Sequence, residues 1–185
     1  MKQKLLLAVL ISVILVVAGC GKAKQKVPVS GEQMEAIVSP LVNTEGKEIG
    51  QVTMVQEKEG VLINVQADNL PPGTHGIHIH ETGVCTPPDF TSSGAHFNPT
   101  GKAHGFDNPK GFHLGDLPNI EVDNDGKVAM ELMNAEITLK KGQETSILDK
   151  DGSAIVIHEK ADDYKTDPAG DSGARIACAA FTGKK

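Results

Sequence analysis

The chain has 185 residues, a net charge of −6, one tyrosine and no tryptophan. This length predicts one domain that is large enough to bury a proper core. The negative charge disfavours a nucleic-acid partner, because phosphate binding needs a basic surface. It would also repel an anionic substrate at long range, so that such a substrate would need a locally positive entrance.

The first 19 residues are predicted to be a bacterial lipoprotein signal peptide. Two lysines precede an apolar run from Leu5 to Val17, which is too short to favour a membrane-spanning helix. The small residues of VAGC stand directly before Cys20 and resemble a lipobox, in which the cysteine is acylated and becomes the new N-terminus. We therefore expect a lipid anchor at Cys20. The alternative is a plain secretory signal, which would leave Cys20 unpaired and exposed.

Residues 20–32 are polar and basic and have no hydrophobic period, so they predict a lipidated flexible tether before a domain at 33–185. Loss of residues 1–19 removes two lysines and no acidic residue. The mature chain then carries 16 basic and 24 acidic residues, a net charge of −8. The expected location is extracytoplasmic, with the membrane contacted through the N-terminal lipid, either at the cell surface or facing the periplasm.

Short strands and turn signals dominate the mature chain. Residues 61–67 alternate with a period of two, and less regular strand candidates lie at about 33–42, 48–57, 74–81, 127–139, 153–158 and 174–182. The turn signals LPPG, DNDG and DKDG separate them, and DNDG lacks the further ligands of an EF-hand calcium loop. The pattern predicts an all-β sandwich or barrel.

Two long segments without a strand pattern, 82–119 and 159–173, separate the predicted strands. Each follows a candidate ligand, His80 for the first and His158 for the second. Long irregular loops in a compact domain are typically functional. We therefore expect these two loops to carry the site.

Two cysteines remain once Cys20 is assigned to lipid. Cys85 and Cys178 form an even pair in an exported chain, which predicts one disulfide. It would close a loop of about ninety residues and contribute on the order of 4 kcal/mol in the chain-entropy model. Two buried free thiols are the alternative.

Six of the seven histidines and one aspartate form an ordered set of candidate metal ligands, because imidazole is the commonest protein ligand for copper and zinc. His78 and His80 are two apart on a predicted strand, so their side chains share a face and can share one metal. An H-x-H pattern is a weak signal by itself, and surface coincidence is its alternative. His158 alone predicts nothing, since a histidine at the end of an apolar run is usually a hydrogen-bonded residue.

The segment 96–116 gives a more specific signal. It is rich in glycine and proline and contains His96, His104, His113 and Asp116. Three histidines and one aspartate complete a tetrahedral zinc shell of the closed, structural kind. Zinc would also offset the entropy lost on ordering so long a loop. Solvated loop histidines are the alternative.

Five motifs in order, GIHIHE, GAHFNP, HGFDNPKGFHLGDLPN, HEKADD and SGARIAC, make the chain resemble the copper,zinc superoxide dismutases from about residue 33 to 182. The resemblance implies an eight-stranded Greek-key β-barrel with two long functional loops and the family's disulfide between Cys85 and Cys178. It also implies two metal sites bridged by an imidazolate at His96: copper at His78, His80, His96 and His158, and zinc at His96, His104, His113 and Asp116.

Three further positions carry over from the resemblance. Asp162 matches the carboxylate that links a copper histidine to a zinc histidine, here His78 and His104. Arg175 matches the arginine beside the open copper position, and a strand-end salt bridge is its plain alternative. His75 matches a histidine that is not a ligand and has a framework role.

The implied enzyme is a superoxide dismutase that converts superoxide to oxygen and hydrogen peroxide. Copper would alternate between oxidation states, Arg175 would orient the anion, and His96 would supply a proton. The second loop departs from better-known members. Its stretch DYKTDPAGDSGA has one lysine, Lys165, against Asp162, Asp163, Asp167 and Asp171, and Pro168 stands about where many eukaryotic members have a steering lysine. Guidance of the substrate would then be weaker, or would come from other lysines, Lys102, Lys110 or Lys160.

Two other functions stay open. One is a non-enzymatic extracytoplasmic lipoprotein that binds copper and zinc on the same fold, and loss of a copper ligand would favour it. The other is a purely structural zinc barrel, which would leave the copper histidines and Arg175 without a shared purpose. The oligomeric state is open between monomer and homodimer.

Overall fold

The computed structural model describes residues 36–183. The predicted signal peptide, Cys20 and the tether lie outside the described residues, as do residues 33–35 and 184–185 of the predicted domain. Among residues 36–183, no helix is long and apolar enough to cross a membrane. The helical structure in this range is one 3-10 turn, η1 (Thr91–Ser93).

The described part of the chain contains nine strands, all paired antiparallel: β1 (Ile37–Asn43), β2 (Glu48–Gln56), β3 (Val61–Ala67), β4 (Gly73–His75), β5 (Ile77–His80), β6 (Ile120–Val122), β7 (Val128–Asn134), β8 (Ser153–His158) and β9 (Arg175–Phe181). Seven of them form one sheet in the order β5-β8-β9-β1-β2-β3-β7, and β4 pairs with β6.

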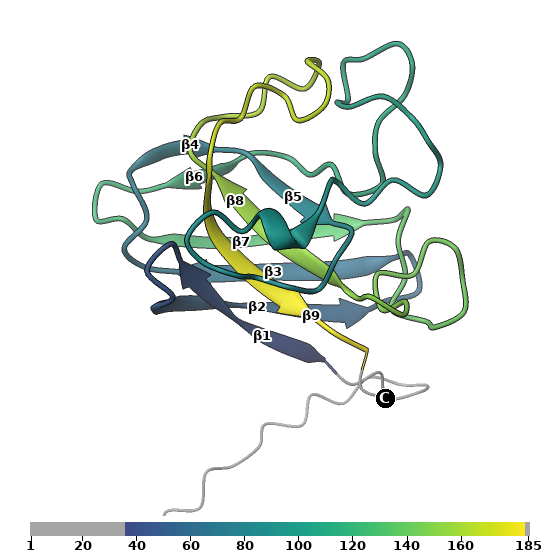
Figure 1. Cartoon of the computed structure of the whole chain (residues 1–185), viewed down its shortest axis with the longest axis horizontal. Coiled ribbons are helices and arrows are strands. Elements are labelled where there is room, and N and C mark those ends of the chain that lie inside the picture. Colours follow the sequence, from purple (N-terminus) through teal and green to yellow (C-terminus); the bar gives the residue numbers. More distant parts are fainter. Residues whose placement is uncertain (1–35, 184–185) are drawn as a thin grey trace, which may run out of the picture. The chain divides into compact units, whose positions relative to one another are not determined.

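The two sheets together form a curled Greek-key β-barrel. β4 continues into β5 past Gly76, and β6 turns into β7 through a hydrogen bond from Asp123 N to Lys127 O of 2.9 Å. The β4–β6 pair therefore joins the two edges of the large sheet. The connections from β3 to β4 and from β7 to β8 link strands that are not neighbours in the sheet. Figure 1 shows the curled sheet, with part of the first long loop beside the second long loop above it. The predicted all-β barrel is confirmed.

The strands differ from the sequence prediction in three main respects. The run 74–81 is divided at Gly76, whose N–H donates to Lys160 O and whose carbonyl accepts from the N–H of His158, both at 2.8 Å. β6 was not among the predicted strands. With it, the described strands number eight when β4 and β5 are counted as one, as the resemblance implied. The predicted strand 127–139 ends at Asn134, whose side-chain amide donates to Leu114 O at 2.9 Å.

The barrel interior follows from the period of two. β3 alternates strictly, with Val61, Ile63 and Val65 fully buried, and β2 contributes Val52 and Met54 to the same core. Burial of each such side chain contributes roughly 1.5–3 kcal/mol. The alternating outward positions are partly or fully exposed on β3, so one face of this strand meets solvent.

β5 and β8 are buried on both faces, and this places the site. On β5 the isoleucines Ile77 and Ile79 belong to the core, so His78 and His80 lie on the outer face, yet all four residues are buried. All six residues of β8 are buried as well. The outer face of these two strands is thus covered by the long loops rather than by solvent.

The disulfide fastens the first long loop to this outer face. Cys85 bonds to Cys178 of β9, with Cα atoms 5.7 Å apart and 93 residues between them in sequence. Both sulfurs lie next to a small second apolar cluster, formed by Phe90, Ala154, Val156 and Cys178. The predicted disulfide is confirmed, and free thiols at these two positions are excluded.

Candidate metal centre

The first long loop lies along the edge of β5 as two short extended segments. Phe97 N donates to Ile79 O and Ile79 N donates to Gly115 O, both at 2.8 Å, and isolated bridges pair His80 with His96 and His78 with Asp116. A Cβ at residue 115 would overlap Ile79 O, so a glycine is needed for this close approach. The pairing brings loop ligands next to the strand histidines.

Four histidines meet on the outer face of β5 and β8. Each offers one ring nitrogen, and these atoms lie within 4.8 Å of one another in a fully buried group, His78, His80, His96 and His158. The four nitrogens have no hydrogen-bond partner: Nδ1 of His78 and Nε2 of the other three. A buried polar atom without a partner is costly. Four imidazole lone pairs that converge in this way form a donor set suited to copper.

The opposite ring nitrogen of each of these histidines is occupied. His80 Nδ1 donates to Gly94 O at 3.0 Å, and His158 Nδ1 lies 3.3 Å from Gly173 O. A carbonyl can only accept, so the proton sits on Nδ1 and the neutral ring presents a bare lone pair at Nε2. In His78 the Asp162 carboxylate accepts from Nε2 at 2.7 Å, which leaves Nδ1 bare instead. The surroundings therefore select the nitrogen that faces the group.

Burial keeps these histidines neutral. It lowers the pKa of His96 to about 4 and that of His158 to about 3, and it also lowers the pKa of His78 and, more strongly, that of His80. A metal competes with protons for the imidazole lone pair. At neutral pH the rings can therefore receive a cation without first losing a proton at the bare nitrogen.

A second buried group shares His96 and lies wholly in the first long loop. Oδ1 of Asp116 lies 2.9, 3.0 and 3.3 Å from Nδ1 of His96, His104 and His113. Its Oδ2 accepts from the backbone N–H groups of Gly105 at 2.8 Å and of His113 at 3.0 Å. Burial raises the pKa of Asp116, but the hydrogen bonds to the three rings outweigh it and hold this pKa far below its usual range. Three imidazoles and one carboxylate match a closed zinc shell.

Asp162 connects the two groups. Its Oδ2 lies 2.7 Å from Nε2 of His78 and its Oδ1 lies 3.0 Å from Nε2 of His104. Burial lowers the pKa of His104, but the two carboxylates of Asp116 and Asp162 outweigh it and raise this pKa to about 9. Outer carboxylates of this kind orient ligand rings. Asp162, the residue predicted from sequence to link the two sites, is therefore in contact with a histidine of each.

Sequence reasoning missed the residues that hold Asp162. Asn119 Nδ2 donates to Asp162 O, and Asp162 N donates to Asn119 Oδ1, both at 2.9 Å. The N–H of Asn119 donates to Tyr164 Oη at 2.7 Å, and Tyr164 N donates to Oδ1 of Asp162 at 2.6 Å. Asn119 stands in the quoted motif, but its spacing gives no sign of a partner 43 residues away. These bonds lock the two long loops together.

Arg175, the first residue of β9, lies beside the four-histidine group. It is opposite His158 in the β8–β9 register and is half-buried. Nη2 donates to Gly94 O at 2.7 Å, the same carbonyl that accepts from His80. Nη1 donates to Phe90 O at 2.8 Å and to Ser93 Oγ at 2.9 Å. Its partners are carbonyls and a hydroxyl rather than a carboxylate, which argues against a strand-end salt bridge.

The remaining candidates lie around this centre. His75 has Nδ1 2.8 Å from His158 O and Nε2 2.8 Å from Pro71 O, which is a framework position outside both groups. The four lysines considered for guidance of an anion are exposed on the two long loops: Lys102, Lys110, Lys160 and Lys165.

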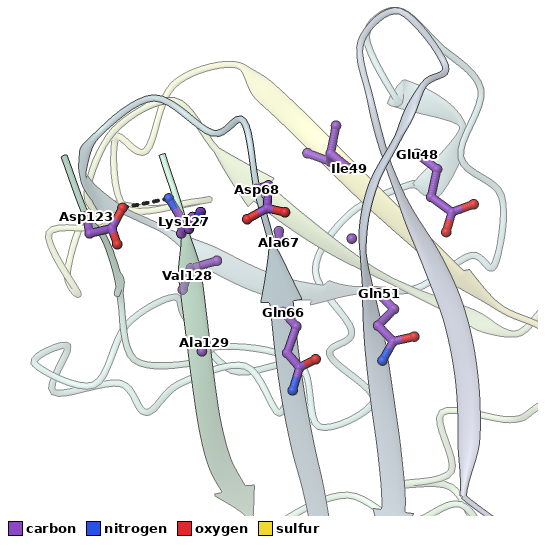
Figure 2. A pocket seen from close by; sticks show the side chains of 11 residues that line it. Glu48, Ile49, Gln51, Gln66, Ala67, Asp68, Asp123, Lys127, Val128 and Ala129 are labelled. Atoms are coloured by element: carbon purple, nitrogen blue, oxygen red, sulfur yellow. Dashed lines mark hydrogen bonds between the residues drawn. The ribbon is translucent and has the colours of Figure 1, made fainter. Parts of the chain in front are cut away.

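An open groove of about 630 Å³ lies away from this centre, at one end of β2, β3 and β7. Figure 2 shows Gln51 and Gln66 along it, with the hydrogen bond from Lys127 N to Asp123 at its rim. None of the candidate ligands lines this groove. The candidate chemistry is therefore placed in the histidine groups and not in the groove.

Comparisons with known proteins point to one enzyme family. The family model described as copper/zinc superoxide dismutase (SODC) matches residues 48–181. A superoxide dismutase-like protein of Bacillus subtilis is 48% identical over 177 residues, which covers 90% of each chain. Superoxide dismutase [Cu-Zn] 1 of Aquifex aeolicus is 50% identical over 139 residues, covering 75% of this chain and 82% of that protein.

Two solved structures share the fold. That of a SOD-like protein from Bacillus subtilis has a TM-score of 0.75 and 52% identity, covering 77% of this chain and 96% of that chain. That of the Cu/Zn superoxide dismutase from Brucella abortus has a TM-score of 0.64 and 30% identity, covering 79% and 99%. With a family match over most of the chain and relatives of this identity, the chain belongs to the copper/zinc superoxide dismutase family.

Proposed function

We propose that this protein is a copper- and zinc-dependent superoxide dismutase that acts outside the cytoplasm from a lipid anchor at Cys20. It would convert two superoxide anions and two protons into oxygen and hydrogen peroxide. The observation that carries the proposal is the set of four unpartnered, buried ring nitrogens that face one another beside Arg175.

The two donor sets support different metals. His78, His80, His96 and His158 would hold copper through four imidazoles, and His96, His104, His113 and Asp116 would hold zinc. His96 can belong to both because its two nitrogens face opposite ways: Nε2 belongs to the first group and Nδ1 lies against Asp116. Copper supplies the reversible one-electron chemistry that dismutation requires, which zinc lacks.

The side chains of this chain would do the rest. Arg175 stays cationic, and its remaining N–H groups can orient a small anion next to the histidines, a preorganised electrostatic contribution. Nε2 of His96 is the atom that can hold a proton and pass it to the reduced substrate, while Nδ1 keeps the ring in place. Asp162 fixes the rings of His78 and His104 by its two short contacts. The second proton would come from solvent.

A non-enzymatic metal binder remains the second candidate, since the Bacillus subtilis relatives are named only as superoxide dismutase-like. Loss of a copper ligand would favour that function, and this chain has histidine at all four positions. A binder would also have no need of an arginine held beside the histidines by three hydrogen bonds. Both observations favour the enzyme.

One experiment separates these functions. The mature protein, loaded with copper and zinc, is analysed for metal content and for superoxide dismutation, alongside His158→Ala and Arg175→Ala. We expect the wild type to be active, His158→Ala to hold less copper and lose activity, and Arg175→Ala to keep both metals but react more slowly. If the loaded wild type holds both metals yet is no faster than His158→Ala, the protein is a binder and not this enzyme.

The location is tested separately. Lipidation would place the wild-type protein in the membrane fraction, and Cys20→Ala would release it or leave it unprocessed. Mass spectrometry of the mature N-terminus identifies the acylated residue. A soluble mature protein with an unmodified cysteine would refute the anchor.

A further inference from the structure

The turn that holds Arg175 is built around an unusual backbone conformation. Phe90 has a φ of 54° in the left-handed region, directly before η1, and Gly94 with a φ of 76° follows it. Left-handed backbone is disfavoured for an aromatic residue and persists where the surroundings enforce it. Here the Phe90 ring is fully buried against the outer face of β8 and β9, next to the disulfide. The turn is therefore fixed at its base.

Ser93 supplies the side-chain acceptor for Arg175 in this turn. Its side chain is fully buried, and its hydroxyl donates its only hydrogen to Phe90 O at 2.9 Å. The lone pairs of Ser93 Oγ are then free to accept from Nη1 of Arg175, also at 2.9 Å. The serine hydroxyl and the Phe90 carbonyl thus occupy both hydrogens of Nη1.

This arrangement decides which part of the guanidinium is left for an anion. An arginine has five N–H groups, and among the described residues three of those on Arg175 donate to the turn. The two that remain are on Nε and Nη2. If Nη1 lost one of its acceptors, the guanidinium could rotate toward solvent and its remaining donors would no longer be held in one direction.

We propose that Ser93 is a positioning residue for Arg175, and that its buried hydroxyl sets the affinity of the site for small anions. The inference deepens the proposed function, since superoxide is such an anion, but it concerns anion binding and not electron transfer. Ser93 acts only through the arginine and contacts none of the unpartnered ring nitrogens.

The neighbouring serine offers a matched control. Ser92 belongs to the same turn, and its hydroxyl donates to Val84 O at 3.0 Å and accepts from Thr86 N at 2.8 Å. It has no bond to Arg175. Ser92→Ala therefore removes a hydroxyl and two hydrogen bonds from the turn without touching the guanidinium, whereas Ser93→Ala removes the contact to Nη1.

Azide serves as the anion probe. It is titrated into the full mature protein loaded with copper and zinc, and binding is followed by the change in the visible absorption of copper. We expect the Kd for azide to rise about three- to tenfold in Ser93→Ala, less than for full loss of a hydrogen bond to a charged group, because the guanidinium keeps its bonds to Phe90 O and Gly94 O. Ser92→Ala should stay within about twofold of the wild type. For superoxide, Ser93→Ala should affect KM more than kcat.

A double-mutant cycle tests whether Ser93 acts through the arginine. In an Arg175→Lys background, Ser93→Ala should cause no further loss of azide affinity, because the Nη1 group is already absent. Metal content and thermal unfolding are measured for every variant, so that weaker azide binding is compared only among folded, loaded proteins.

Three results would overturn the inference: equal azide affinity in Ser93→Ala and the wild type, an equal loss in Ser92→Ala, or an undiminished loss in the lysine background. A wild type that binds no azide would overturn it as well. A wild type that binds azide in a Ser93-dependent way but does not dismutate superoxide would leave this inference standing and refute the proposed function.

Discussion

Substitution of Gly170 by alanine should break the link between the two metal groups. Gly170 lies in the second long loop with a φ of 66°, and a Cβ at this position would overlap Oδ1 of Asp162 and lie 2.8 Å from Nε2 of His104. These are the two atoms whose contact joins the zinc group to Asp162. The methyl group therefore has to displace the carboxylate, the imidazole, or both.

The size of the effect can be separated into a backbone part and a contact part. The left-handed backbone alone costs an alanine about 1–2 kcal/mol. Displacement of the carboxylate also weakens its hydrogen bonds with Tyr164 N and His104 Nε2, at 2.6 and 3.0 Å. Each such bond to a charged group contributes about 1.5–3 kcal/mol. Loss of an outer carboxylate lowers metal affinity about 10- to 100-fold, so the zinc affinity of Gly170→Ala should fall by that factor.

Gly101→Ala is the matched control. Gly101 also lies in a metal-binding loop, its φ of 62° is nearly the same, and a Cβ there would meet nothing within 4 Å. Zinc affinity is measured by competition with a chelator, and the free energy of unfolding by denaturation of the metal-free proteins. Both variants should lose the backbone part of the stability, and only Gly170→Ala should lose zinc affinity. Equal zinc affinities for the two variants would refute the claim that Asp162 orients His104.

Three further outcomes are expected. Reduction of the disulfide, which joins residues 93 apart, should lower the free energy of unfolding by on the order of 4–5 kcal/mol in the chain-entropy model, and a change below about 1 kcal/mol on denaturation with reductant would contradict it. Asn119→Ala removes both hydrogen bonds to the backbone of Asp162, whereas Tyr164→Phe removes one acceptor, so Asn119→Ala should release zinc faster. Stopped-flow chelation measures both release rates, and equal rates would be inconsistent with this order. The dismutation rate should fall with ionic strength if Arg175 and the exposed loop lysines dominate the local field, whereas a rise with salt would show that the net negative charge governs access.

The strands that sequence predicts well are those in which burial repeats along the chain. β3 alternates over seven residues, and its buried positions are the predicted ones. β6 has only three residues, too few for a period, and it exists because β4 lies opposite it. The division of the run 74–81 at Gly76 also has a distant cause, since the backbone there bonds to residues 158 and 160. Such features depend on partners that sequence spacing does not identify.

The site shows the same division between local and distant causes. The two histidines of β5 share a face because a strand alternates, and the loop residues of the second group lie in one short stretch of sequence. The partners of Arg175 are different in kind, because a guanidinium that donates to backbone carbonyls leaves no trace in the side-chain sequence. Asn119 was missed for the same reason, since it acts on the backbone of Asp162.

The choice of ring nitrogen gives the two long loops their main role. The strand places His78 and His80 on one face but leaves each ring free to present either nitrogen. The first loop supplies the Gly94 carbonyl that holds Nδ1 of His80, and the second supplies the Asp162 carboxylate that holds Nε2 of His78. Neighbouring histidines of one strand thus present different nitrogens to a common point. The barrel sets the positions of the strand histidines, and the loops set which of their atoms can bind. A barrel with altered loops would keep His78, His80 and His158 but lose the arrangement that makes them part of a metal centre.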